Sequence, residues 1–139
     1  MKQKKSPEIH IFHDYRTLSV PRTRLHKTAE KIFRDNRSVG NRAVNIIFLS
    51  DYKIRKLNRE YRNRDRATDV LSFTFNDNDF LGEVYISLQK ASTQARRYRC
   101  SYADEVNRLF VHGIFHLLGY NHTTGKERKA MEVQEKRYY

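Results

Sequence analysis

The apolar residues in the first third of the chain follow two different periods. Between residues 8 and 14, Ile9 and Ile11 alternate with polar neighbours, which predicts a short strand. Pro21 then opens a stretch with apolar residues at helical spacing, so we expect a helix that ends before a turn at Gly40. The apolar positions of this helix are Leu25, Ala29, Ile32 and Phe33.

A second strand and helix follow directly. Residues 43–50 form a nearly continuous apolar run with several β-branched residues, which is typical of a central strand. Ser50 can cap the next helix, which is strongly basic and carries Ile54, Leu57 and Tyr61 on one side. At this spacing we expect Tyr61 to pack in the core.

The middle of the chain predicts a strand pair and another helix. Residues 69–75 and 81–87 have strand patterns and are joined by a short acidic loop, so they are close enough in sequence to pair antiparallel. Ser87 begins a helix that ends near Arg99.

Two helices complete the pattern. Ser101 and Asp104 form a capping box that opens one helix, and a last helix follows Gly125. The order of elements predicts an α/β (α+β) fold, with a small four-stranded mixed sheet covered by about five helices. We expect residues 1–139 to form a single domain without repeats or linkers.

The charge balance of the chain indicates a polyanionic partner. Lys and Arg number 28 against 16 Asp and Glu, a net charge of +12, which favours nucleic acid over no anionic partner. The single cysteine, Cys100, excludes an internal disulfide and suits a reducing compartment. The start of the chain lacks the apolar segment of a signal peptide, and no apolar run is long enough for a membrane span. We therefore expect a cytoplasmic protein with no membrane association.

Three histidines have the spacing of metal ligands. His112 and His116 are four residues apart, so on a helix they share a face, and Gly119 can turn the chain so that His122 approaches them. Such a trio rarely arises from packing alone, and zinc suits neutral imidazole. Three protein ligands leave a fourth position for water or substrate, which indicates catalysis. Cys100 is too far before the histidines to be a fourth ligand.

Metzincin proteases share this spacing in their H-E-x-x-H-x-x-G-x-x-H motif. Here Gly113 replaces the glutamate that carries protons between the metal-bound water and the leaving amine. Peptide hydrolysis is therefore disfavoured, although a metalloprotease remains an alternative. Met131 could correspond to a Met-turn, but a methionine in an amphipathic helix is more often part of the core.

A basic segment lies between the second and third predicted strands. For most of its cations, a solvated helix face is the simpler explanation. Arg62 differs because it lies where the helix ends, from where its planar guanidinium could bind a phosphate through two donors. The seven cations are Lys53, Arg55, Lys56, Arg59, Arg62, Arg64 and Arg66.

Three motifs between residues 57 and 122 resemble the YbeY family of single-strand endoribonucleases: LNREYRNRDRATDVLSF, LGEVYIS and HGIFHLLGYNH. The resemblance implies a ribonuclease with one Zn²⁺ per chain. It further implies action on single-stranded RNA in the 3′-end processing of small-subunit (16S) ribosomal RNA, in ribosome maturation and in quality control. The preference for RNA over DNA comes from the resemblance alone.

The resemblance also implies residue roles. The zinc ligands of the family fall on His112, His116 and His122, and its functionally important arginine falls on Arg62, so we expect Arg62 and His116 to be essential for catalysis. Two residues depart from the family pattern. Asn121 and Glu83 stand where aspartate is more usual, and Asn121 removes a charge beside the metal ligands.

Several mechanistic alternatives stay open at this point. Zinc could act as a Lewis acid on the scissile phosphate or supply a hydroxide, and no general base stands out. Glu105 and Arg108 precede His112 on one helix stripe, where we expect ordinary surface residues, and Tyr98 could stack on a base. A noncatalytic zinc-containing ribosome assembly factor is a further alternative. The sequence carries no signal for an oligomeric state.

Overall fold

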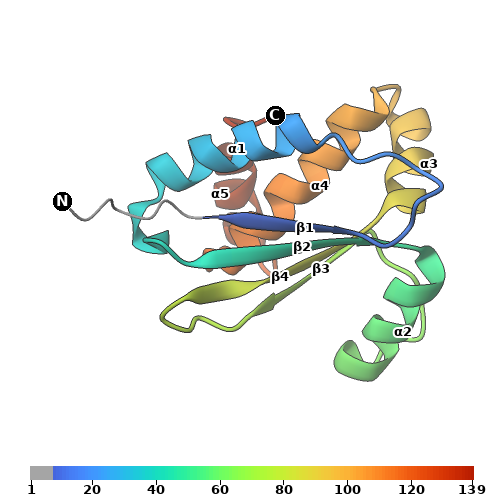
Figure 1. Ribbon diagram of the computed structural model, residues 1–139, viewed down its shortest axis with the longest axis horizontal. Coiled ribbons are helices and arrows are strands. Elements are labelled where there is room, and N and C mark those ends of the chain that lie inside the picture. Colours follow the sequence, from blue (N-terminus) through green and yellow to red (C-terminus); the bar gives the residue numbers. More distant parts are fainter. Residues whose placement is uncertain (1–7) are drawn as a thin grey trace.

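A four-stranded mixed sheet with five helices forms the single domain of this α/β fold (Figure 1). The structure is a computed structural model that describes residues 8–139. The strands are β1 (Ile9–His13), β2 (Ala43–Leu49), β3 (Val70–Thr74) and β4 (Phe80–Ser87). The helices are α1 (Arg22–Asp35), α2 (Asp51–Arg62), α3 (Leu88–Tyr98), α4 (Tyr102–Leu117) and α5 (Gly125–Glu135), with a 3-10 turn η1 (Arg37–Val39) before β2. The predicted fold class and element order are confirmed.

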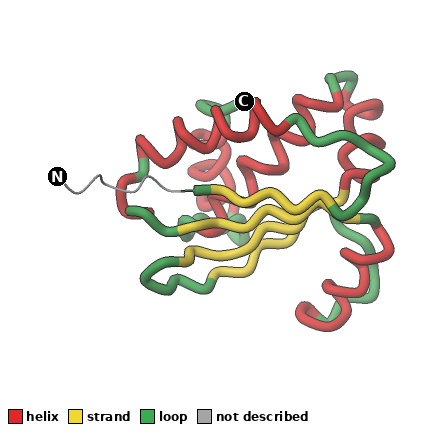
Figure 2. Tube along the Cα trace, in the orientation of Figure 1, coloured by secondary structure: helices red, strands yellow, loops and turns green. Residues whose placement is uncertain are grey.

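The strand order in the sheet is β1-β2-β4-β3 (Figure 2). β1, β2 and β4 are parallel, and β3 runs antiparallel to β4, as expected for two strands joined by a short loop. Ile11 pairs with Ile46, and Ile46 pairs with Val84. β3 is consequently an edge strand beside β4, and the predicted central strand β2 lies inside the sheet.

The two faces of the sheet are covered by different helices. α1, α4 and α5 lie on one side of the sheet, and α2 lies on the other side near one end (Figure 1). Residues that point toward α4 are fully buried, among them Ile46, Val84 and Ile86. Their neighbours Glu83 and Tyr85 point to the opposite face and are only half-buried. One face of the sheet thus builds the core, and the other is partly open.

Helix ends follow the predicted capping residues. The side chains of Ser50, Ser87 and Ser101 each accept a hydrogen bond from a backbone N–H in the first turn of α2, α3 and α4. Thr124 does the same for α5. Arg99 ends α3 in the left-handed conformation, at φ 54°. These local signals place α4, which carries two of the candidate ligands.

Two expectations about single residues are wrong. The side chain of Tyr61 is 63% exposed, because α2 is anchored by Ile54 and Asn58 and its last turn projects beyond the core. Glu105 is only 1% exposed, because α3 and α5 pack against α4 and cover this stripe. Arg108 pairs with it, its Nη2 atom 2.6 Å from a Glu105 carboxylate oxygen.

Within residues 8–139, no helix is both long and apolar enough to cross a bilayer. Met131 is buried in the core cluster, as expected for a core residue. Cys100 is exposed and lies outside the histidine cluster.

Candidate metal centre

The three predicted ligands converge at the end of α4. His112 and His116 lie one turn apart on this helix, and Gly119 follows it with φ +99°, a conformation that favours glycine. The chain then turns back so that one ligand nitrogen from each of His112, His116 and His122 lies within 4.8 Å of the others. The structure therefore brings together the residues that the spacing predicted, and they could hold a metal ion.

The orientation of two rings is set by hydrogen bonds to their Nδ1 atoms. Nδ1 of His116 lies 3.0 Å from the backbone oxygen of Tyr120, and Nδ1 of His112 lies 2.9 Å from Oε1 of Glu135. Both partners are acceptors, so each Nδ1 carries the proton of the neutral ring. The unprotonated Nε2 atoms then face each other at 3.1 Å. Two nitrogens bound to one tetrahedral zinc ion would be roughly 3.3 Å apart, so the geometry fits such an ion.

The environment of His116 keeps its ring neutral. The pKa of His116 is lowered to about 4, mainly by burial and secondly by the neighbouring imidazoles of His112 and His122. The carbonyl of Tyr120 and the carboxylate of Glu135 oppose this shift. Near neutral pH, His116 therefore offers a lone pair and not a second proton, which is what metal binding requires.

Glu135 is a part of the site that the sequence analysis did not identify. It lies on α5, is 3% exposed, and accepts hydrogen bonds from His112 and from the hydroxyl of Tyr139. A carboxylate that holds the second nitrogen of a ligand histidine fixes the ring and makes it a stronger donor to the metal. The available signal was its position four residues after Met131, on the buried side of a predicted helix.

A cavity of about 520 Å³ opens beside the histidines. His112 and His122 line it together with three cations and two carboxylates, which are Arg108, Arg128, Lys136, Glu132 and Glu135. Because Arg108 is paired with Glu105, Arg128 and Lys136 are the cations of this wall that would attract an anionic ligand.

Gly113 faces the sheet and not the histidine cluster. A Cβ atom at this position would lie 2.4 Å from Cγ1 of Val84 and 3.3 Å from Oγ of Ser72. The hydroxyl of Ser72 also donates a hydrogen bond to the backbone oxygen of Gly113. The position therefore has no room for the glutamate of a metzincin motif, because a side chain here would clash with the sheet.

Arg62 lies in a different cavity from the histidines. Its Nη2 atom donates to the backbone oxygen of Ser72 at 2.8 Å, and its guanidinium carbon lies 4.7 Å from the ring centroid of Phe73. Ser72 thus contacts Arg62 through its carbonyl and Gly113 through its hydroxyl. One residue of the edge strand separates Arg62 from the helix turn that carries His112.

Comparison with known proteins agrees with this geometry. The family described as Endoribonuclease YbeY matches residues 10–139. The chain belongs to the YbeY family. The resemblance that the motifs indicated is therefore confirmed, and the match extends well beyond residues 57–122 on both sides.

Members of the YbeY family from distant bacteria are similar over much of their length. The Endoribonuclease YbeY of Desulforamulus reducens is 45% identical over 102 residues, which are 66% of this chain and 67% of that protein. The Endoribonuclease YbeY of Acholeplasma laidlawii is 36% identical over 126 residues, 89% of this chain and 88% of that protein. The solution structure of TM1509 from Thermotoga maritima matches 94% of this chain and 85% of its own, with a TM-score of 0.65 and 31% identity.

Proposed function

We propose that this protein is a zinc-dependent, single-strand-specific endoribonuclease that processes the 3′ end of small-subunit ribosomal RNA in ribosome maturation and quality control. Membership of the YbeY family supports the hydrolysis of RNA phosphodiester bonds. The net charge of +12 supports a polyanionic substrate.

The observation that carries the proposal is the convergence of three imidazoles from one helix end and the following loop. His112, His116 and His122 would hold one zinc ion per chain, because their ligand nitrogens already lie within 4.8 Å of one another. Bound there, zinc would supply a Lewis acid for a phosphate oxygen, or a water whose pKa is lowered to roughly 7. Because the three imidazole ligands are neutral, they would not offset the double positive charge of the ion.

The chain itself would supply orientation and charge around the phosphate. Glu135 holds the proton on Nδ1 of His112, so that Nε2 stays available as a ligand. Arg128 and Lys136 line the adjoining cavity and would attract the RNA backbone. These cations and the histidines lie on α4, α5 and the loop between them, so the substrate would bind across this part of the fold.

Arg62 would bind a phosphate of the same RNA strand. One of its N–H groups is used by the carbonyl of Ser72, which fixes the guanidinium and leaves other donors free. A guanidinium can bind a phosphate through two parallel hydrogen bonds. Because Ser72 also contacts Gly113 on α4, a strand held by Arg62 would lie close to the helix turn with the histidines.

The test is cleavage of single-stranded RNA by the zinc-loaded chain, with folding of each variant checked by circular dichroism. We expect His116→Ala to lose both zinc and cleavage, and Arg62→Ala to lose cleavage but keep zinc. Arg64→Ala, which removes a cation from the loop after α2, should keep both zinc binding and RNA cleavage. A zinc-loaded wild-type chain that binds RNA without cutting it would indicate an assembly factor, and cleavage of casein would indicate a protease.

A further inference from the structure

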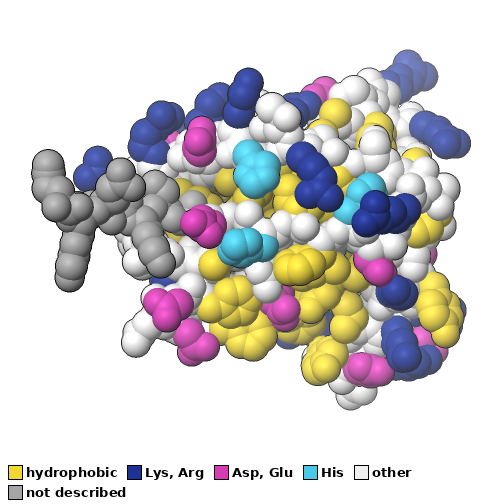
Figure 3. Space-filling view, in the orientation of Figure 1, with side chains coloured by type: hydrophobic (Ala, Val, Ile, Leu, Met, Phe, Trp, Pro, Cys, Tyr) yellow, Lys and Arg dark blue, Asp and Glu magenta, His cyan; other side chains and the backbone are white. Residues whose placement is uncertain are grey.

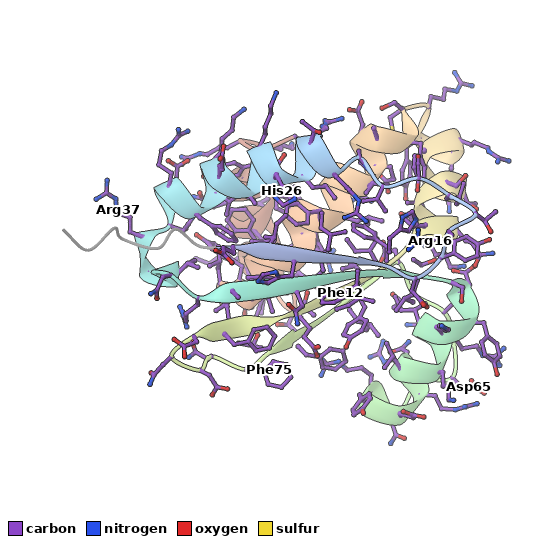
Figure 4. The ribbon with its side chains drawn as sticks, in the orientation of Figure 1. Phe12, Arg16, His26, Arg37, Asp65 and Phe75 are labelled. Carbon is purple, nitrogen blue, oxygen red and sulfur yellow. The ribbon has the colours of Figure 1, made fainter. Side chains whose placement is uncertain are left out.

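The face of the sheet opposite α1 and α4 carries aromatic side chains that the histidine site does not use. In Figure 3, hydrophobic side chains gather over the region of β3 and β4, and Figure 4 shows Phe75 on the side of the sheet away from α1. Tyr61 and Phe75 are 63% and 51% exposed. Exposed aromatic residues clustered on a basic protein indicate a surface for a partner with flat rings and negative charge.

These residues surround a cavity of about 540 Å³. Its aromatic wall consists of Tyr61, Phe73, Phe75 and Tyr85, completed by Leu57 and Thr74. The rings of Tyr61 and Tyr85 each contact Phe73 edge to face, with centroids 5.7 Å apart. This volume lies in the range of sites for small molecules and is large enough for one nucleotide.

Two charged groups of opposite sign lie in the same cavity. The guanidinium of Arg62 is held over Phe73, and the carboxylate of Glu83 lies beside the hydroxyl of Tyr85. The pKa of Tyr85 is raised to about 12, mainly by burial and secondly by the charge of Glu83 and its hydrogen bond. The hydroxyl of Tyr85 therefore stays a donor. Glu83 forms no salt bridge with any residue between 8 and 139, which leaves carboxylate lone pairs for a ligand.

We propose that this cavity is a base-binding subsite for single-stranded RNA, selective for guanine. The aromatic side chains would stack on the base, which is worth roughly a factor of ten or more in affinity per base. Guanine presents two adjacent N–H donors on its Watson–Crick edge, which match the two oxygens of Glu83. Adenine and cytosine present an amino group beside an acceptor, and uracil presents one N–H between two carbonyls, so each would place an acceptor against the carboxylate.

The position of Arg62 indicates how a nucleotide would be oriented in the cavity, with its base inside and its phosphate at the guanidinium. Its guanidinium lies at the wall of the cavity, against the edge strand, where it can meet the phosphate of a nucleotide whose base is stacked inside. Glu83 would repel phosphate from the inner part of the cavity. The inference rests on the proposed function in one respect: the strand would continue past Ser72 toward the histidines.

The experiment measures binding of GMP, AMP, CMP and UMP to the full-length chain by NMR, with a chelator present so that phosphate cannot bind a metal ion. We expect the dissociation constant for GMP to be about tenfold lower than for the other three. Tyr61→Leu should weaken GMP binding roughly tenfold. Glu83→Gln should remove the preference for guanine, because an amide offers one acceptor and one donor.

Tyr52→Leu is the matched control, since Tyr52 is an exposed tyrosine on the same helix that lines a different cavity. It should bind GMP like the wild type, and so should His116→Ala. This last variant separates the two proposals, because a chain that cannot cut RNA should still bind GMP. Equal affinity for all four nucleotides, or no effect of Tyr61→Leu, would overturn the subsite. Tyr61-dependent dimerisation without nucleotide binding would assign the surface to a second copy of the chain instead.

Discussion

Nδ1 of His112 on α4 lies 2.9 Å from Oε1 of Glu135 on α5. This hydrogen bond ties the last helix to the candidate metal centre across 23 residues of sequence. Its acceptor is buried and charged, so it orients the ring and fixes which nitrogen is protonated. The C-terminal helix thus has a role in the site as well as in the core.

The first prediction concerns this carboxylate. Glu135→Gln keeps the shape of the side chain but removes its charge, so the His112 ring becomes a weaker donor to zinc. We expect zinc affinity to fall about tenfold or more, measured by competition with a chromophoric chelator. Glu132→Gln is the control for the loss of charge, because Glu132 lines the same cavity but forms no hydrogen bond with His112 or His116. Equal zinc affinity of Glu135→Gln and the wild type would remove Glu135 from the site.

Gly113 provides a test of packing between α4 and the sheet. Gly113→Ala places a methyl group 2.4 Å from Val84 in the core, so either the helix or the strand must shift. We expect a loss of about 1–3 kcal/mol in the free energy of unfolding, measured with urea. At Gly125 an added Cβ meets no atom within 4 Å, so Gly125→Ala should lose far less. Similar losses for both variants would contradict the close approach described here.

The buried ion pair on α4 predicts a further stability effect. Arg108→Ala leaves the carboxylate of Glu105 buried without its partner, which should cost about 2–4 kcal/mol, the lower end reflecting partial exposure of Arg108. Adding Glu105→Gln should recover part of this loss, because the unpaired charge is then absent. A neutral effect of Arg108→Ala on thermal unfolding would show that Glu105 is solvated or protonated.

The low pKa of His116 predicts how stability depends on pH. In the folded chain His116 stays neutral down to about pH 4, whereas in the unfolded chain it binds a proton near its ordinary pKa of 6.5. Acid therefore favours the unfolded state, and this contribution to stability is lost as the pH falls from 6.5 to 4.

The measurement is urea unfolding of the metal-free chain across this pH range. His116→Gln lacks the titrating ring, so its stability should fall less steeply than that of the wild type. The difference between the two slopes then reports the contribution of His116, including its charge interaction with His112 and His122. Parallel slopes would show that His116 is as solvated in the folded chain as in the unfolded one.

The secondary structure could be predicted because its signals are local. Alternating Ile9 and Ile11, the β-branched run before Ser50 and the serine caps all act within a few residues. The histidine cluster was predictable for the same reason: His112 and His116 share a helix face, and Gly119 turns the chain immediately afterwards.

Contacts between distant segments could not be predicted from local patterns. Whether Glu105 is buried depends on α3 and α5 covering α4, and the exposure of Tyr61 depends on where α2 leaves the sheet. The partners of His112 and Gly113, which are Glu135 and Ser72, lie on elements far away in sequence. Helical periodicity gives the face of a residue but not the neighbour that covers it.

The most direct test of the central claim is an anomalous-scattering map from crystals of the chain soaked in zinc. We predict one zinc ion bound by a ring nitrogen from each of His112, His116 and His122, at about 2.0–2.1 Å, with the fourth position open to solvent. An ion enclosed by a fourth protein ligand would make the site structural. Rings that point apart, with no zinc between them, would contradict a metal-dependent ribonuclease.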